Sequence, residues 1–191
     1  MKKLNFLVIL LAMSIIACKS EKKETIVEEE IEEIVESEVV TPKKVTMQLA
    51  SKSDSNVTGN IVFTEENGNV SMTAVMTGLE SGEHAIHIHA SSDCSSPDGK
   101  SAGGHWNPTN TPHGKWGAAE GYHKGDIGNF TADESGNATV SFSTDEWCIG
   151  CGDDTKDILG KGVIVHAGAD DFTSQPSGAA GARVSCAGII E

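Results

Sequence analysis

Six of the seven histidines in the chain, together with one aspartate, have the residue types and spacing of ligands for two neighbouring metal ions. Imidazole binds copper and zinc well, and a carboxylate often completes a zinc site. His87 and His89 lie two residues apart in an alternating run, so in a strand both side chains would point to the same face and could hold one ion. A single histidine is more often structural, but a set of this size is hard to explain by chance. The full set is His87, His89, His105, His113, His123, Asp126 and His166.

The elements that must position these side chains are predicted to be strands. Short alternating runs recur between glycine-rich turns, and helical periodicity is weak. Residues 65–69 are typical of a hairpin turn, and residues 133–137 give a second turn signal. This pattern predicts an antiparallel β-sandwich or β-barrel. The predicted strands are 45–50, 57–64, 70–77, 84–90, 127–132, 138–143, 162–167 and 182–186.

Three stretches fit no strand: residues 91–125, 145–161 and 168–181. The first is rich in Gly, Ser, Pro and Asn, and most of the candidate ligands lie in it or beside it. Loops of this length in a compact domain usually have a function. We therefore expect the chemistry to depend on these loops.

The N-terminal residues predict export. Three residues with two lysines precede an apolar run over residues 4–17, which is short for a membrane span and suits a signal peptide. The run ends in Ile-Ile-Ala-Cys, which resembles a bacterial lipobox, so cleavage would leave Cys18 as a lipid-bearing first residue. The alternative is an ordinary signal peptide followed by a chance cysteine. We predict a signal peptide (1–17), a lipidated tether (18–44) and one domain (45–191).

Charge distinguishes the predicted tether from the domain. Residues 19–44 hold nine Glu and five Lys with no Gly and no aromatic residue, which predicts a solvated, mostly disordered spacer. Residues 45–191 hold seven Lys and Arg against nineteen Asp and Glu, a net charge of −12. That balance argues against nucleic acid as a partner and against binding of anionic lipid by the domain itself. Contact with a membrane is expected only through Cys18.

Four further cysteines are expected to form two disulfides, because an exported protein meets an oxidising environment. Their spacing leaves the connectivity open. Cys148 and Cys151 form a CxxC pair, which could be redox-active or bind zinc. No second pair and no thioredoxin-like context accompanies it, so a small local disulfide is favoured. The other two cysteines are Cys94 and Cys186.

Four blocks of sequence resemble the copper/zinc superoxide dismutase family, and together they span most of residues 45–191. The long first loop is similar to that of the bacterial exported branch. The resemblance implies an all-β fold, an eight-stranded antiparallel Greek-key β-barrel with two long functional loops. The blocks are GEHAIHIH (82–89), GGHWNP (103–108) with PHG (112–114), HKGDIGNF (123–130), and VIVHAGADD (163–171) with GAAGARVSCAG (178–188).

The resemblance also implies a role for each candidate residue. His105 would bridge the two metals, Cys94 would pair with Cys186, Arg183 would receive an anionic substrate over the copper, and Asp170 would link a copper ligand to a zinc ligand. The implied copper ligands are His87, His89, His105 and His166. The implied zinc ligands are His105, His113, His123 and Asp126.

The implied activity is conversion of superoxide to dioxygen and hydrogen peroxide at copper beside a structural zinc, with His105 taking up and returning a proton. Copper and zinc are then the only cofactors and superoxide the substrate. One alternative is a non-catalytic copper- and zinc-binding surface lipoprotein, and another is a structural or adhesive β-sandwich. The expected location is the periplasmic side of a membrane or the cell surface. The sequence leaves open whether the chain forms a homodimer.

Overall fold

Buried and exposed side chains alternate along several strands of this protein, such as Asn69–Thr77, which places one face of each in a common core. Gly162–His166 is instead buried on both faces. The computed structural model describes residues 41–191. The predicted signal peptide, Cys18 and all but the last few residues of the predicted tether lie outside these described residues. The first strand begins at Lys43, so the tether's last two predicted residues belong to the barrel. Within residues 41–191, no helix is long and apolar enough to cross a membrane.

All eight predicted strands are confirmed, each with bounds within two residues of those expected. The alternating runs form strands because every second side chain enters the core while its neighbours face outward. The strands are β1 (Lys43–Ser51), β2 (Thr58–Glu66), β3 (Asn69–Thr77), β4 (Gly82–His89), β5 (Gly128–Ala132), β6 (Ala138–Thr144), β7 (Gly162–His166) and β8 (Arg183–Gly188).

The strands pair antiparallel in the order β5-β4-β7-β8-β1-β2-β3-β6, which forms a nearly closed barrel and confirms the predicted fold class. The hairpin between β2 and β3 turns at Asn67 and Gly68, both with left-handed backbone angles (φ 51° and 76°), as a type I′ turn requires. The second predicted turn links β5 to β6, but these two strands do not pair with each other. They lie at the two edges of the sheet, where β5 pairs with β4 and β6 with β3.

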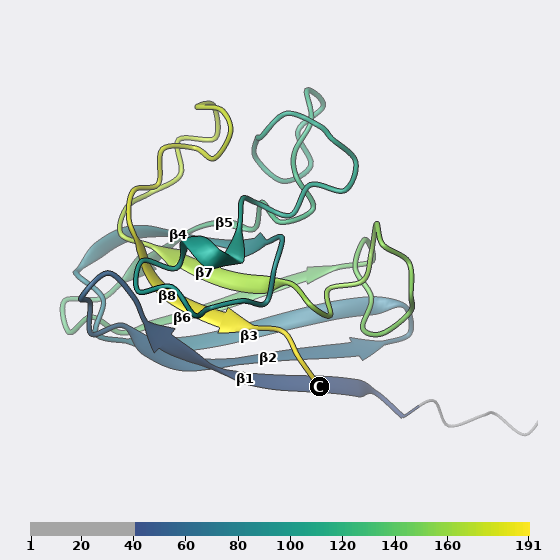
Figure 1. Ribbon diagram of the computed structural model, residues 1–191, viewed down its shortest axis with the longest axis horizontal. Helices are drawn as coiled ribbons and strands as arrows, with labels where there is room; N and C mark the ends of the chain where they lie inside the picture. Colours follow the sequence, from purple (N-terminus) through teal and green to yellow (C-terminus); the bar gives the residue numbers. More distant parts are fainter. Residues whose placement is uncertain (1–40) are drawn as a thin grey trace, which may run out of the picture. The chain divides into compact units, whose positions relative to one another are not determined.

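β4 presents different chemistry on its two faces. Ile86 and Ile88 belong to the hydrophobic core, whereas His87 and His89 point to the opposite face. Both histidines are buried nonetheless, because the long loops cover that face. Figure 1 shows the loops after β4 and after β7 rising from the side of the barrel that carries these two strands. The first loop contains a single 3-10 turn, η1 (Lys100–Ala102).

Candidate metal centre

Four histidines converge over β4 and β7. His87 and His89 lie on β4, and His166 ends β7, which pairs with β4. His105 comes from the long loop and is brought to the strand by an isolated β-bridge to His89. One ring nitrogen from each of the four lies within 4.8 Å of the others, so these side chains can share one ion.

A second group of four lies beside the first and shares His105 with it. The carboxylate of Asp126 is at its centre, with its oxygens 2.8 Å from His105 Nδ1, 3.0 Å from His113 Nδ1 and 3.2 Å from His123 Nδ1. Ligand atoms of one tetrahedral ion bound at about 2.0–2.1 Å lie about 3.3 Å apart, close to these separations. The backbone N–H groups of Gly114 and His123 also donate to Asp126 and fix its carboxylate.

Six of the seven ring nitrogens that would bind metal are buried and have no hydrogen-bond partner, and the seventh, His105 Nδ1, contacts Asp126 Oδ1 at 2.8 Å. Buried polar atoms without partners are rare in folded proteins, and each one calls for a ligand or another explanation. Although His113 Nδ1 and His123 Nδ1 are near Asp126, neither makes a hydrogen bond with it. One such nitrogen is present on each of the six histidines of the two groups: His87 Nδ1, His89 Nε2, His105 Nε2, His113 Nδ1, His123 Nδ1 and His166 Nε2.

Two histidines of the first group, His89 and His166, are each held by a backbone carbonyl at the opposite ring nitrogen. His89 Nδ1 donates to the Gly103 carbonyl at 2.9 Å, and His166 Nδ1 donates to the Gly181 carbonyl at 3.3 Å. A carbonyl can only accept, so each contact fixes the tautomer that leaves the other nitrogen free to bind a metal. The sequence did not predict these two glycine carbonyls, because a backbone acceptor leaves no signal in residue type.

Asp170 connects the two groups. Its carboxylate accepts hydrogen bonds from His87 Nε2 and His113 Nε2, each at 2.9 Å, and from the backbone N–H of Phe172 at 2.7 Å. Gly178 lies directly against it: a Cβ at this position would be 1.7 Å from Asp170 Oδ1. The hydrogen bond from His113 to Asp170, which joins the two long loops, therefore requires glycine at position 178. Gly178 lies in a block of the family resemblance, but this steric role was not predicted.

The electrostatic environment differs between the two sides of the centre. Burial lowers the pKa of His105 to about 4 and that of His166 to about 3, so these imidazoles are neutral, as metal binding requires. Burial would also lower the pKa of His113, but the carboxylates of Asp126 and Asp170 outweigh it and raise that pKa to about 9. Burial disfavours the charged form of Asp126, yet the surrounding imidazoles hold its pKa well below the usual range.

A cavity of about 360 Å³ opens over the first group, lined among others by His89, His105, His166 and Arg183. Arg183 begins β8 opposite His166, and its Nη1 donates to the Gly99 carbonyl at 2.8 Å. The disulfide between Cys94 and Cys186 joins the segment that carries Gly99 to the strand that carries Arg183. The hydrogen bond holds the guanidinium at the cavity, and the disulfide fixes the segment that carries its acceptor, Gly99.

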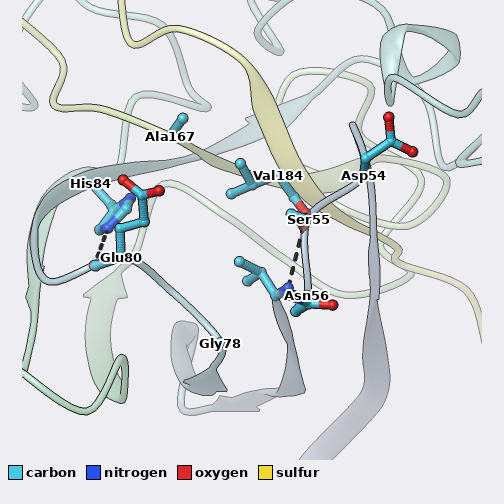
Figure 2. A pocket seen from close by; sticks show the side chains of 9 residues that line it. Asp54, Ser55, Asn56, Gly78, Glu80, His84, Ala167 and Val184 are labelled. Atoms are coloured by element: carbon cyan, nitrogen blue, oxygen red, sulfur yellow. Dashed lines mark hydrogen bonds between the residues drawn. The ribbon is translucent and has the colours of Figure 1, made fainter.

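The remaining cysteines and the seventh histidine lie outside the centre. Cys148 and Cys151 form the small local disulfide. His84 lines a different hollow with Glu80 and Asp54 (Figure 2), and its ring nitrogens contact the carbonyl oxygens of His166 at 2.9 Å and Glu80 at 2.8 Å. A carbonyl can only accept, so in either neutral tautomer the ring N–H donates to a backbone carbonyl, which agrees with the structural role expected for a histidine outside the ligand set.

The donor sets distinguish the two sites chemically. Four imidazoles without thiolate suit copper, and three imidazoles with one carboxylate suit a closed tetrahedral zinc site. Together with the eight-stranded antiparallel barrel, this arrangement defines a protein with two adjacent metal sites that share one histidine.

Comparison with known proteins identifies the family. Residues 57–189 match the sequence profile of copper/zinc superoxide dismutase (SODC). A relative from Aquifex aeolicus (strain VF5), superoxide dismutase (Cu-Zn) 2, is 35% identical over 143 residues, which cover 72% of this chain and 81% of that protein. The chain belongs to the copper/zinc superoxide dismutase family, which confirms the resemblance and the choice of copper and zinc.

Solved structures agree with this assignment. A SOD-like protein from Bacillus subtilis has a TM-score of 0.67 and 29% identity over 76% of this chain and 97% of its own. The clock protein EA4 has the same TM-score and 31% identity over 78% of this chain and 96% of its own. Both similarities cover almost the whole of the other chain, so the fold is shared over nearly the full length of those proteins.

Proposed function

We propose that the chain is a superoxide dismutase that converts superoxide to dioxygen and hydrogen peroxide. The supporting observation is that six unpartnered imidazole nitrogens and one carboxylate form two adjacent donor sets that share His105. We assign copper to His87, His89, His105 and His166, and zinc to His105, His113, His123 and Asp126. Bound copper supplies one-electron exchange, so that two superoxide ions and two protons give the two products.

Arg183 binds the anionic substrate in this proposal. It lines the cavity over the copper ligands, and the hydrogen bond to the Gly99 carbonyl uses one of the five N–H donors of the guanidinium. The remaining donors and the fixed positive charge suit a small anion. Gly99 and the disulfide therefore act indirectly, by holding the guanidinium at the cavity.

His105 is proposed to carry a proton to the product. Its Nε2 is buried at the cavity without a partner, and its Nδ1 faces Asp126. With zinc held by His105 Nδ1 and Asp126, the ring would keep one orientation, so Nε2 would stay in place whether or not it holds a proton. A proton held there would lie within the substrate cavity.

The rival function is metal binding without turnover. Three of the similar solved structures are described as one SOD-like protein from Bacillus subtilis or its mutants, so the fold alone does not establish activity. This chain has both complete donor sets, and the cavity over them is lined by Arg183 as well as by His89, His105, His123 and His166, which favours the enzyme. A structural or adhesive sandwich would need none of these unpartnered nitrogens.

Superoxide decay with metal analysis tests the proposal. The purified residues 41–191, loaded with one copper and one zinc, should accelerate the decay, and the His105→Ala variant should not. A loaded protein that leaves superoxide decay at its spontaneous rate would support the metal-binding rival instead.

We also propose that the enzyme is a lipoprotein anchored through Cys18 on the periplasmic side of a membrane or at the cell surface. The supporting observations are the apolar run and the lipobox-like Ile-Ile-Ala-Cys sequence. Incorporation of labelled fatty acid into the full chain, but not into the Cys18→Ala variant, is the expected result. Equal labelling of both would refute the anchor.

A further inference from the structure

The zinc ligand His123 lies between two residues that are held from outside their own loop. The hydroxyl of Tyr122 donates to Glu146 Oε1 at 2.6 Å, and the ammonium of Lys124 forms an ion pair with Glu146 Oε2. The indole N–H of Trp147 donates to the Lys124 carbonyl at 2.8 Å. Two consecutive residues after β6 therefore hold both neighbours of His123.

Glu146 and Trp147 follow directly after β6 and are fixed to the barrel and its core. Trp147 is 1% exposed, and its ring packs against Phe142 and Phe63, with centroid distances of 5.0 and 6.1 Å. The backbone N–H of Glu146 donates to Thr144 Oγ1 at the end of β6. A buried aromatic ring in a close-packed core keeps one position, so its N–H is a fixed point for the loop.

His123 needs such support more than the other ligands do. The rings of His87, His89, His113 and His166 are each oriented by a hydrogen bond on the nitrogen that does not face the metal. Among residues 41–191, no hydrogen bond reaches the corresponding nitrogen of His123, Nε2. Its ring is therefore positioned largely through its backbone. Within the same loop, Asp126 accepts the His123 N–H and Thr111 donates to the Tyr122 carbonyl, and from outside the loop Glu146 and Trp147 hold both neighbours.

We propose that Glu146 and Trp147 are positioning residues that hold His123 in place and so slow the release of zinc. The inference rests on the zinc ligands assigned under the proposed function. Partners that orient a metal ligand often change metal affinity by about 10–100-fold when they are lost. The clamp acts one step further away, on the backbone, so a smaller change is expected.

The test measures transfer of zinc from the copper- and zinc-loaded protein to a chromophoric chelator. Glu146→Gln and Trp147→Phe should each release zinc about fivefold faster, since the first loses the charge that holds Tyr122 and Lys124 and the second loses a hydrogen bond of ordinary strength to the Lys124 carbonyl. Glu146→Gln keeps the size of the side chain, so copper content and the melting temperature of the metal-free protein should stay close to wild type in that variant, which a general loss of structure would not allow. Trp147→Phe places a smaller ring in the core, so its melting temperature should fall while its copper content stays at the wild-type value.

Glu65→Gln is the matched control. Glu65 holds the segment after β6 that also carries Glu146 and Trp147, because its Oε2 accepts the backbone N–H of Ile149 at 2.9 Å. This is the same chemical change, but it touches neither neighbour of His123, so the rate of zinc release should stay at the wild-type value.

A double-mutant cycle separates the clamp from unrelated effects. Tyr122→Phe removes the donor of the Tyr122–Glu146 hydrogen bond and Glu146→Gln removes the charge of its acceptor, so the double variant should release zinc more slowly than the product of the two single effects predicts. One bound zinc with wild-type release rates in Glu146→Gln and Trp147→Phe would overturn the clamp alone. A wild-type protein that binds no zinc would overturn the zinc assignment and the clamp together.

Discussion

At the scale of single residues, Asp170 is the point at which the two metal sites depend on each other. It accepts hydrogen bonds from one imidazole of each site, so its position affects the orientation of both rings. The sequence resemblance predicted this link. The space that the link needs was not predicted, because it depends on Gly178 from a different part of the loop.

Gly178→Ala should weaken binding of both metals. The new methyl group would overlap Asp170 Oδ1 and lie 2.7 Å from His113 Nε2, so the carboxylate must move. We expect each metal affinity to fall about 10–100-fold, the usual effect of losing such a partner. Competition titrations with copper and zinc chelators measure the two affinities separately.

Gly160→Ala is the control for this substitution. Gly160 has a similar left-handed φ of 79°, against 68° for Gly178, but a Cβ there meets no atom within 4 Å. It therefore reproduces the backbone strain without the overlap and should leave both affinities unchanged. Wild-type affinities in Gly178→Ala would contradict the role given to this contact.

Tyr122 gives a pH-dependent signal from the zinc loop. Its hydrogen bond to Glu146 raises the pKa of the phenol to about 12, above the usual value of about 10. The folded state favours the neutral phenol, so this contribution to stability is complete below about pH 10 and is lost as the pH rises through 12.

Absorbance of tyrosinate measures this directly, because the chain contains one tyrosine. In Glu146→Gln the midpoint should move down toward 10. A wild-type midpoint near 10, with circular dichroism showing an intact fold, would be inconsistent with the hydrogen bond.

At the scale of elements, the sequence predicted the strands well and the contacts between loops poorly. Strand bounds depend on local alternation, which is visible in a run such as residues 70–77. The separation of β5 and β6 to opposite edges depends on the order of all eight strands. The clamp on His123 joins residues more than twenty positions apart through a backbone carbonyl and an indole N–H. No local sequence pattern predicts the Tyr122–Glu146 hydrogen bond or the one from Trp147 to the Lys124 carbonyl.

The two disulfides should differ in their contribution to stability. Cys94 and Cys186 are separated by 92 positions, and Cys148 and Cys151 by only three. A cross-link stabilises mainly by restricting the unfolded chain, by about 4–5 kcal/mol for the long loop and about 2 kcal/mol for the short one. Serine pairs at each site, compared by urea unfolding of the metal-free protein, measure the two values.

Only the long-range disulfide should also affect catalysis. Its loss frees the segment that holds Arg183 through Gly99, so the rate of superoxide decay should fall in the Cys94→Ser, Cys186→Ser variant even when both metals remain bound. If removal of the Cys148–Cys151 bond lowered the free energy of unfolding more than removal of the Cys94–Cys186 bond, the expected order of the two contributions to stability would be wrong.

At the scale of the whole molecule, an anionic substrate must reach a chain with a net charge of −14. Charges on the exposed surface are screened beyond about 8–10 Å at physiological salt, so the field near the cavity is set by groups close to it. Arg183, the only arginine, lies at that cavity. Local positive charge can therefore outweigh the distant acidic surface.

Arg183→Ala should lower the rate of superoxide decay several-fold while both metals stay bound. The substitution removes the positive group at the cavity but no metal ligand. Stopped-flow decay with metal analysis checks both parts. Lys44→Ala, which removes the same charge from an exposed position at the start of β1, should keep the wild-type rate. An unchanged rate in Arg183→Ala would remove this residue from the mechanism.

The proposed chemistry depends on one imidazole, that of His105, binding a copper ion and a zinc ion at the same time. Anomalous diffraction at the copper and zinc absorption edges, from a crystal of residues 41–191 loaded with both metals, shows whether it does. We expect one peak of each metal, with copper next to Nε2 and zinc next to Nδ1 of the same ring. A single occupied site, or a His105 ring turned away from either ion, would rule out the shared imidazole.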